Sequence, residues 1–133
     1  MPGDSRSLLD SDVLIDLARG YPPAIDLVDG LIAEGERPAI SVVSEMELLV
    51  GARTKSELRL IAQLTRRLLV LPISEMISLR ARNLCARYGL SHGLTIPDAL
   101  IAATAIAARS RLLTRNVRHF SYLPSLRLRA PYT

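Results

Sequence analysis

Three carboxylates and one amide stand in four separate segments of the chain, each beside the predicted end of a strand or start of a helix. Asp10 closes the apolar segment SLLD, and Glu47 lies within the first two turns of the helical segment VVSEMELLVGA. Asp98 lies in the first turn of a helix predicted over residues 96–108, and Asn116 follows the apolar segment RLLT. In an alternating α/β fold, strands end and helices begin at one edge of the sheet. The four polar side chains are therefore predicted to meet there.

A group of carboxylates at one edge needs a cation, because the charges repel one another and their burial costs several kcal/mol when nothing compensates it. Mg²⁺ prefers oxygen ligands, keeps several waters, and is typically held by a few carboxylates together with a substrate phosphate. The sequence holds no His/Cys cluster with zinc spacing and neither of the common Gly-rich phosphate-binding motifs. The chemistry predicted is therefore metal-assisted hydrolysis of a phosphodiester.

Taken one at a time, the acids also have structural explanations. Asp10 could cap the short helix that follows it, and Ser44 with Glu47 fits the capping box S-x-x-E. Asp98, in the first turn of its helix, would stabilise the helix dipole by about 0.3–1 kcal/mol. A cap contributes only about 1 kcal/mol, which does not offset the gathering of three charges. Together the acids favour the metal site.

The charge is distributed unevenly along the chain. The formal net charge is +4, the pI is about 9.8, and every basic residue except Lys55 is arginine. Residues 76–133 contain nine arginines, whereas Asp98 is their only acid. Arginine pairs well with phosphate, so a nucleic-acid partner is predicted. Arginine-rich codon usage, a head-to-tail contact or a partner protein covering one face would explain the same pattern.

Short apolar segments alternate with helical ones along the sequence. Strands are predicted at residues 7–10, 39–41, 68–73 and 111–114, and LRLR near the end is a candidate fifth strand. This alternation predicts an α/β class, namely a three-layer α/β/α domain with a central, mostly parallel sheet of four to five short strands.

The helix predicted after Ser74 shows an apolar row at Met76, Leu79, Leu84 and Tyr88, which predicts its buried face.

Residues 1–133 are predicted to form one domain, since 133 residues is the size of a single ordinary domain. No apolar run approaches the roughly 20 residues that span a bilayer, so no membrane association is expected. The single cysteine, Cys85, fits a reducing compartment and predicts a cytoplasmic location.

Four segments in order, LLDSDVLID, ISVVSEMELLVGA, IPDALIAATA and LLTRNVRHF, resemble the signature segments of PIN-domain ribonucleases. The similarity covers residues 7–120 and is strongest to the VapC-type toxins of toxin–antitoxin pairs. The resemblance implies a PIN fold and cleavage of RNA that depends on Mg²⁺, with Mn²⁺ as an alternative. It also implies a small antitoxin partner and a homodimer, for which the amphipathic segments 24–34 and 54–67 are candidate contact sites.

Residue by residue, the resemblance assigns metal binding and catalysis to Asp10, Glu47 and Asp98, and supporting roles to Ser11, Thr114 and Asn116. Many members have an acid where this chain has Asn116, so a second metal site is in doubt. Two arginines flank this asparagine and are candidates for contact with RNA phosphate, namely Arg115 and Arg118.

The residues leave some assignments open. Asp12 either adds a charge to the site or merely begins a helix, and we favour the second. Asp16 is expected to pair with Arg19, and both histidines, His92 and His119, are expected to be structural. The missing fourth acid keeps a rival function open, a catalytically weak PIN-like module that binds RNA or protein without cutting.

Overall fold

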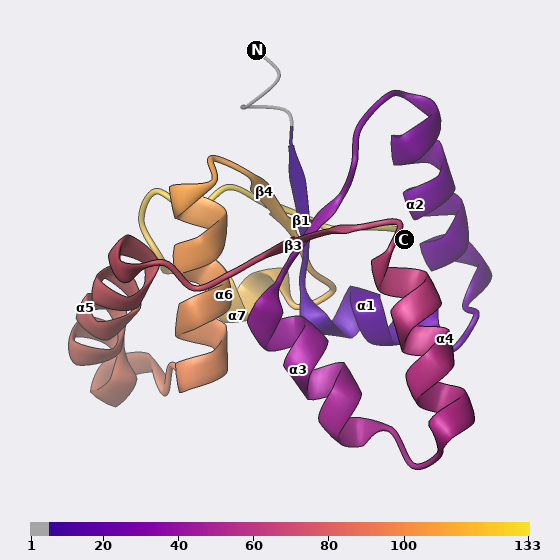
Figure 1. The fold of residues 1–133 in the computed structure, drawn as a ribbon. Coiled ribbons are helices and arrows are strands. Elements are labelled where there is room, and N and C mark those ends of the chain that lie inside the picture. The colour runs from indigo at the N-terminus through magenta and orange to yellow at the C-terminus, as the bar shows by residue number, and fades with distance from the viewer. Residues whose placement is uncertain (1–5) are drawn as a thin grey trace.

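The computed structural model describes residues 6–133 as a central sheet with helices packed on both of its faces (Figure 1). The sheet has five parallel strands in the order β3-β2-β1-β4-β5 within these residues. The strands are β1 (Ser7–Leu9), β2 (Ala39–Ser41), β3 (Leu69–Leu71), β4 (Arg111–Leu113) and β5 (Leu128–Arg129). The helices are α1 (Ser11–Ala18), α2 (Pro22–Ala33), α3 (Val42–Gly51), α4 (Lys55–Thr65), α5 (Glu75–His92), α6 (Ile96–Ala107) and α7 (Val117–Phe120).

The predicted α/β class and the mostly parallel sheet are confirmed. The strands predicted at 68–73 and 111–114 are longer than those observed, because pairing stops where the neighbouring strand ends. In β3 the last pair joins Leu71 to Ser41, and in β4 it joins Leu113 to Arg129. Thr114, the residue after β4, directs its hydroxyl to the Asp10 carboxylate at 2.8 Å.

Both faces of the sheet are buried. Leu8 and Leu112 point into the core formed with α5, α6 and α7, and the neighbouring Leu9 and Leu113 point into the core formed with α1 and α2. These four side chains are at most 1% exposed. Such two-sided burial requires continuous apolar strands, and Figure 1 shows α5 and α6 on one side of the sheet and α1, α2 and α4 on the other.

Helix α6 is apolar almost all round, as its burial requires. Its start is fixed by Thr95, whose side chain accepts a hydrogen bond from the Asp98 backbone N–H, and by Pro97 in the first turn. Its buried residues are mostly alanine and pack against both the sheet and α5. Among residues 6–133, no helix is both long and apolar enough to cross a membrane.

The buried face predicted for α5 is wrong in part. Met76 is 64% exposed and Leu79 is 45% exposed, whereas the buried residues of this helix are Ile77, Ala81 and Leu84. The spacing of these three follows one face of a helix. A small residue such as Ala81 is favoured there because the facing helix α6 is rich in alanine and lies close. The exposed residues instead border a groove.

Candidate active site

Asp10 lies at the point where β1 ends and α1 begins, and it is only 6% exposed. Its carboxylate caps the helix by accepting a hydrogen bond from the Ser11 backbone N–H at 2.8 Å. The other oxygen, Oδ2, accepts one from the Thr114 hydroxyl at 2.8 Å. Asp10 is thus both a helix cap and a buried acid at the sheet edge.

Thr114 connects the residues that follow the neighbouring strands β1 and β4. It is fully buried at the end of β4, and its hydroxyl accepts a hydrogen bond from the Asn116 backbone N–H at 3.0 Å. Asp12 lies beside it, with Oδ2 at 3.4 Å from the Thr114 hydroxyl and accepting a hydrogen bond from the Arg115 backbone N–H at 3.0 Å. Asp12 Oδ1 is buried without a hydrogen-bond partner among residues 6–133.

Glu47 extends from α3 to the start of α1. Its Oε1 accepts a hydrogen bond from the Ser11 hydroxyl at 2.8 Å, and that hydroxyl also lies 2.8 Å from the hydroxyl of the buried Ser44. The capping-box alternative for Glu47 is wrong, because the residue that caps α3 is Ser41. Glu47 is exposed and turned toward Ser11.

Asp98 enters from the first turn of α6. Its Oδ2 lies 2.8 Å from Nε2 of His119 in α7, and the aspartate side chain is 25% exposed. His119 was expected to be structural, and the structure places it against a predicted metal ligand. The signal available in the sequence was only its position, three residues after Asn116.

The electrostatics of the site centre on Asp10. Burial raises its pKa to about 6 from the ordinary 3.8, although hydrogen bonds from Thr114 and Ser11 oppose the rise. The carboxylates of Asp12 and Asp98 raise it further. Without a cation, the protein therefore holds a poorly compensated negative charge at this edge of the sheet.

A second ion pair borders the site and corrects one prediction. Asp16 forms a salt bridge with Arg115, whose Nε lies 3.0 Å from Asp16 Oδ2, and it accepts a hydrogen bond from the Tyr132 hydroxyl. The partner of Asp16 is therefore Arg115 and not Arg19. Because Arg115 is engaged in this way, Arg118, which is exposed in α7, becomes the stronger candidate for phosphate contact.

Comparison with known proteins places this arrangement in a family. The family model of the PIN domain matches residues 7–124. The chain belongs to the PIN-domain family. This match covers the strands and helices that carry Asp10, Glu47, Asp98 and Thr114.

Relatives of this PIN domain include two named ribonucleases of Mycobacterium tuberculosis. The chain is 40% identical over 120 residues to ribonuclease VapC19, covering 90% of this chain and 95% of that protein. It is 41% identical over 121 residues to ribonuclease VapC10, covering 90% of both.

Solved structures resemble this PIN domain over nearly its whole length. The toxin–antitoxin complex from Klebsiella pneumoniae matches with a TM-score of 0.76 at 32% identity, covering 95% of this chain and 98% of that one. VapBC2 from Rickettsia felis, bound to a promoter DNA fragment, matches with a TM-score of 0.81 at 24% identity, covering 93% and 97%. The second likeness is one of fold.

The donor atoms of this PIN domain fit a hard divalent cation, although they are not gathered around one point. Within residues 6–133, no three His, Cys, Asp or Glu side chains are placed to hold an ion as they stand, since Glu47 turns to Ser11 and Asp98 to His119. Mg²⁺ needs only one or two direct carboxylates and keeps several waters. The buried, unpartnered Oδ1 of Asp12 is an oxygen of the kind such an ion or its waters would satisfy.

Sequence reasoning missed part of this PIN site. Asp12 was favoured as a plain helix residue, but its contacts with Thr114 and with the Arg115 backbone place it at the sheet edge. Burial raises its pKa, with the backbone hydrogen bond from Arg115 opposing the rise. The signal available in the sequence was the position of Asp12 two residues after Asp10. This spacing puts it in the first turn of α1, which begins at the same edge of the sheet.

Proposed function

We propose that this PIN domain is an endoribonuclease acting as the toxin of a toxin–antitoxin pair and depending on Mg²⁺ or Mn²⁺. The ligands in this proposal are Asp10, Glu47 and Asp98, with support from Ser11 and Thr114. The observation that carries it is the burial of the Asp10 carboxylate, which is 6% exposed. The carboxylates of Asp12 and Asp98 add to the rise in its pKa. The relatives named ribonucleases add the substrate class.

The chain's own residues would act mainly by orientation. A divalent ion bound here would activate a water and stabilise the charge that develops on the phosphate. Thr114 fixes one oxygen of Asp10, and Ser11 holds Glu47 within reach of the same edge. His119 restrains Oδ2 of Asp98, which leaves the other oxygen for an ion or its water. Arg118 is proposed to contact the RNA backbone.

Replacing Asp98 with asparagine tests the proposal. Asp98→Asn should remove both RNA cleavage and the rise in melting temperature that Mg²⁺ or Mn²⁺ gives the wild type, because ligand binding to the native state stabilises it. The protein should stay folded, since Thr95 still caps α6 through the backbone. The measurements are a cleavage assay on labelled RNA and thermal unfolding with each metal and with EDTA.

Asp26→Asn, an exposed substitution on α2, is the matched control and should behave like the wild type in both measurements. RNA cleavage that survives in Asp98→Asn, or in EDTA, would contradict the proposal. The rival function, a module that binds RNA or protein without cutting, predicts RNA binding that is equal with and without metal and no cleavage by the wild type.

We also infer that a small antitoxin binds the groove between α1, α3 and α4. This groove has a volume of about 440 Å³ and is bordered by Leu48, Leu60 and Ile61. Glu47 lies at its wall as well as in the site, so a partner that fills the groove reaches the carboxylates. Of the two predicted contact segments, 54–67 borders this groove, whereas the apolar face of 24–34 is largely used in the core.

Leu60→Glu should abolish co-purification with the short protein encoded by the neighbouring reading frame, because it places a charge in an apolar contact. Leu60 is 50% exposed, so the substitution should leave folding intact. Leu90→Glu, at a fully exposed leucine outside the groove, is the control and should co-purify normally. Equal loss or equal retention in both variants would place the partner elsewhere.

Two further expectations belong to this proposal. Residues 1–133 are taken as a single PIN domain, and the functional unit as a homodimer. Helix α3 offers apolar surface for a second copy, since Met46 is 53% exposed and Val50 is 86% exposed.

A further inference from the structure

Three rings gather where the end of α5 meets the segment that follows α7, in a chain that has only one Phe, four Tyr, two His and no Trp. His92 is stacked on Tyr122 with 4.0 Å between ring centroids and 14° between planes, and Tyr88 contacts both rings at 5.7 and 5.3 Å. These residues, Tyr88, His92 and Tyr122, are called the ring cluster below. The Ser91 hydroxyl lies 2.8 Å from His92 Nδ1 and helps to fix this ring.

The ring cluster is accessible and has an unused polar group. His92 is exposed and Tyr122 is stacked on one face of its ring, so the opposite face is the one on which a ligand can stack. The Tyr122 hydroxyl is buried without a hydrogen-bond partner among residues 6–133. Tyr122 follows three residues after His119, whose Nε2 lies 2.8 Å from Asp98 Oδ2. Burial and then the Asp98 carboxylate raise the pKa of Tyr122, in agreement with this placement.

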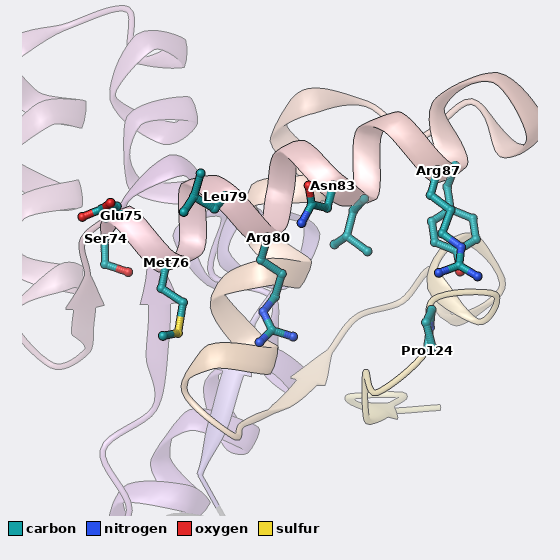
Figure 2. A pocket seen from close by; sticks show the side chains of 10 residues that line it. Ser74, Glu75, Met76, Leu79, Arg80, Asn83, Arg87 and Pro124 are labelled. Carbon is teal, nitrogen blue, oxygen red and sulfur yellow. The ribbon is translucent and has the colours of Figure 1, made fainter.

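A groove along α5 leads to the ring cluster. It has a volume of about 820 Å³ and runs from Ser74 to Tyr88, with Pro124 on its other wall. Figure 2 shows Arg80, Asn83 and Arg87 projecting from the same side of α5 into this groove.

The charge of the groove suits a phosphate backbone. The Arg87 guanidinium lies 5.8 Å from the centre of the Tyr88 ring, at the end of the groove next to the cluster. The Nε of Arg80 is buried and has no partner within residues 6–133. Among residues 6–133, the only acid that lines the groove is Glu75, at the opposite end from Arg87 (Figure 2).

We propose that the α5 groove and the ring cluster together bind an unpaired stretch of the RNA substrate. The groove takes the sugar–phosphate backbone through Arg80 and Arg87, and the open face of His92 stacks on a base. Proteins hold single strands in this way, with a basic groove and aromatic faces on which bases stack. The inference rests on the proposed ribonuclease function and adds to it a subsite next to Asp98 that favours single-stranded RNA.

Base stacking is tested by His92→Leu, which replaces the ring with an aliphatic side chain. Binding is measured by fluorescence anisotropy with the full chain in EDTA, so that no cleavage occurs. The probes are a short labelled polyadenylate and the same oligomer with abasic sites in place of its bases. His92→Leu should weaken binding of polyadenylate about 5- to 150-fold, the usual effect of losing a stacked base. Binding of the abasic oligomer should not change.

Leu90→Ala, at a fully exposed residue near the same helix end, is the structural control and should bind both probes like the wild type. A 2-aminopurine base in the oligomer should lose fluorescence on binding the wild type and should not do so on binding His92→Leu. Equal weakening for both probes, or no weakening, would overturn base stacking at the ring cluster.

The backbone path is tested by Arg87→Gln against Arg82→Gln, which removes the same charge from the same helix outside the groove. Arg87→Gln should weaken binding of both probes and reduce the slope of log K against log salt by about 0.7, as expected for one lost phosphate contact on a single strand. Arg82→Gln should have little effect. Equal effects of the two variants would overturn the groove as the path.

The same experiments separate this inference from the proposed function. If the wild type cleaves RNA with Mn²⁺ but His92→Leu and Arg87→Gln bind like the wild type, the ribonuclease stands and the subsite is wrong. If Arg87→Gln instead changes the molar mass in light scattering without changing RNA affinity, a second copy of the chain occupies the groove and the subsite is again wrong. If the wild type never cleaves, the proposed function fails while the binding results still decide the subsite.

Discussion

Replacing Asp10 with asparagine should stabilise the metal-free protein at neutral pH and, by the same change, abolish its activity. Because the pKa of Asp10 is raised to about 6 from 3.8, ionising this buried acid at pH 7.5 costs up to about 3 kcal/mol of stability. An amide removes that cost but supplies one acceptor oxygen where the carboxylate supplies two, to Ser11 and Thr114. The expected net gain in the free energy of unfolding is about 1–2 kcal/mol.

The pH dependence of this gain has a definite sign. A raised pKa means that the native protein binds more protons than the unfolded chain between pH 3.8 and about 6. The contribution of Asp10 to stability is therefore fully present below the lower value and is lost as the pH rises through the higher one. Urea unfolding without metal should show the advantage of Asp10→Asn at pH 7.5 and its loss at pH 5.

The same substitution should lower the activity while it raises the stability. Asp10→Asn should lower RNA cleavage by at least about 100-fold, the usual effect of removing a group that stabilises developing charge. It should also remove the rise in melting temperature with Mn²⁺. Asp26→Asn, on the exposed side of α2, should change neither stability nor activity. A destabilised metal-free Asp10→Asn would show that helix capping, and not the metal, explains this residue.

Replacing Thr114 with valine should destabilise the protein by about 2–3 kcal/mol, although the two side chains have nearly the same shape. The hydroxyl is fully buried, donates to Asp10 and accepts from the Asn116 backbone. Valine leaves a buried carboxylate oxygen and a backbone N–H without partners. The loss should appear in urea unfolding, and cleavage should fall with it, since Asp10 loses the group that orients it.

Two further variants show whether the loss in Thr114→Val comes from its contact with Asp10. Thr104→Val removes another buried hydroxyl, which donates to the Leu100 carbonyl at 2.7 Å inside α6. It should cost less than about 1 kcal/mol, because that carbonyl lies within the helix, where the backbone can supply a donor. Thr114→Ser keeps the hydroxyl and should restore most of the stability and activity. Equal losses in Thr104→Val and Thr114→Val would mean that the contact with Asp10 has no special weight.

The fold was predictable because its signals are local and repeated. Short apolar strands alternate with helices, and parallel strands buried on both faces must be apolar throughout, as Leu8 and Leu9 show. The face of α5 was not predictable in full. Several apolar stripes are available on that helix, and the choice of Ile77 and Ala81 over Met76 depends on how closely α6 approaches.

In the candidate site, the positions of the acids could be predicted from the sequence, but their contacts could not. Asp10, Asp98 and Glu47 could be placed at one edge of the sheet from topology alone, because each follows a strand or begins a helix. Their contacts could not, because Thr114 with Asp10 and His119 with Asp98 join residues far apart in the chain. The choice of Arg115 as a partner for Asp16 depends on the same tertiary packing. Sequence spacing gives the edge, and three-dimensional packing decides the partners.

The three-residue length of β1 has a consequence for how such a protein can change over time. Leu8 and Leu9 face opposite cores, and Asp10 follows directly. One added or deleted residue here would exchange the two leucines between the layers and rotate the acid away from Thr114. Substitutions among aliphatic residues leave this arrangement intact. Divergent descendants should therefore vary freely in which apolar residues they use at this strand, while insertions and deletions there are eliminated.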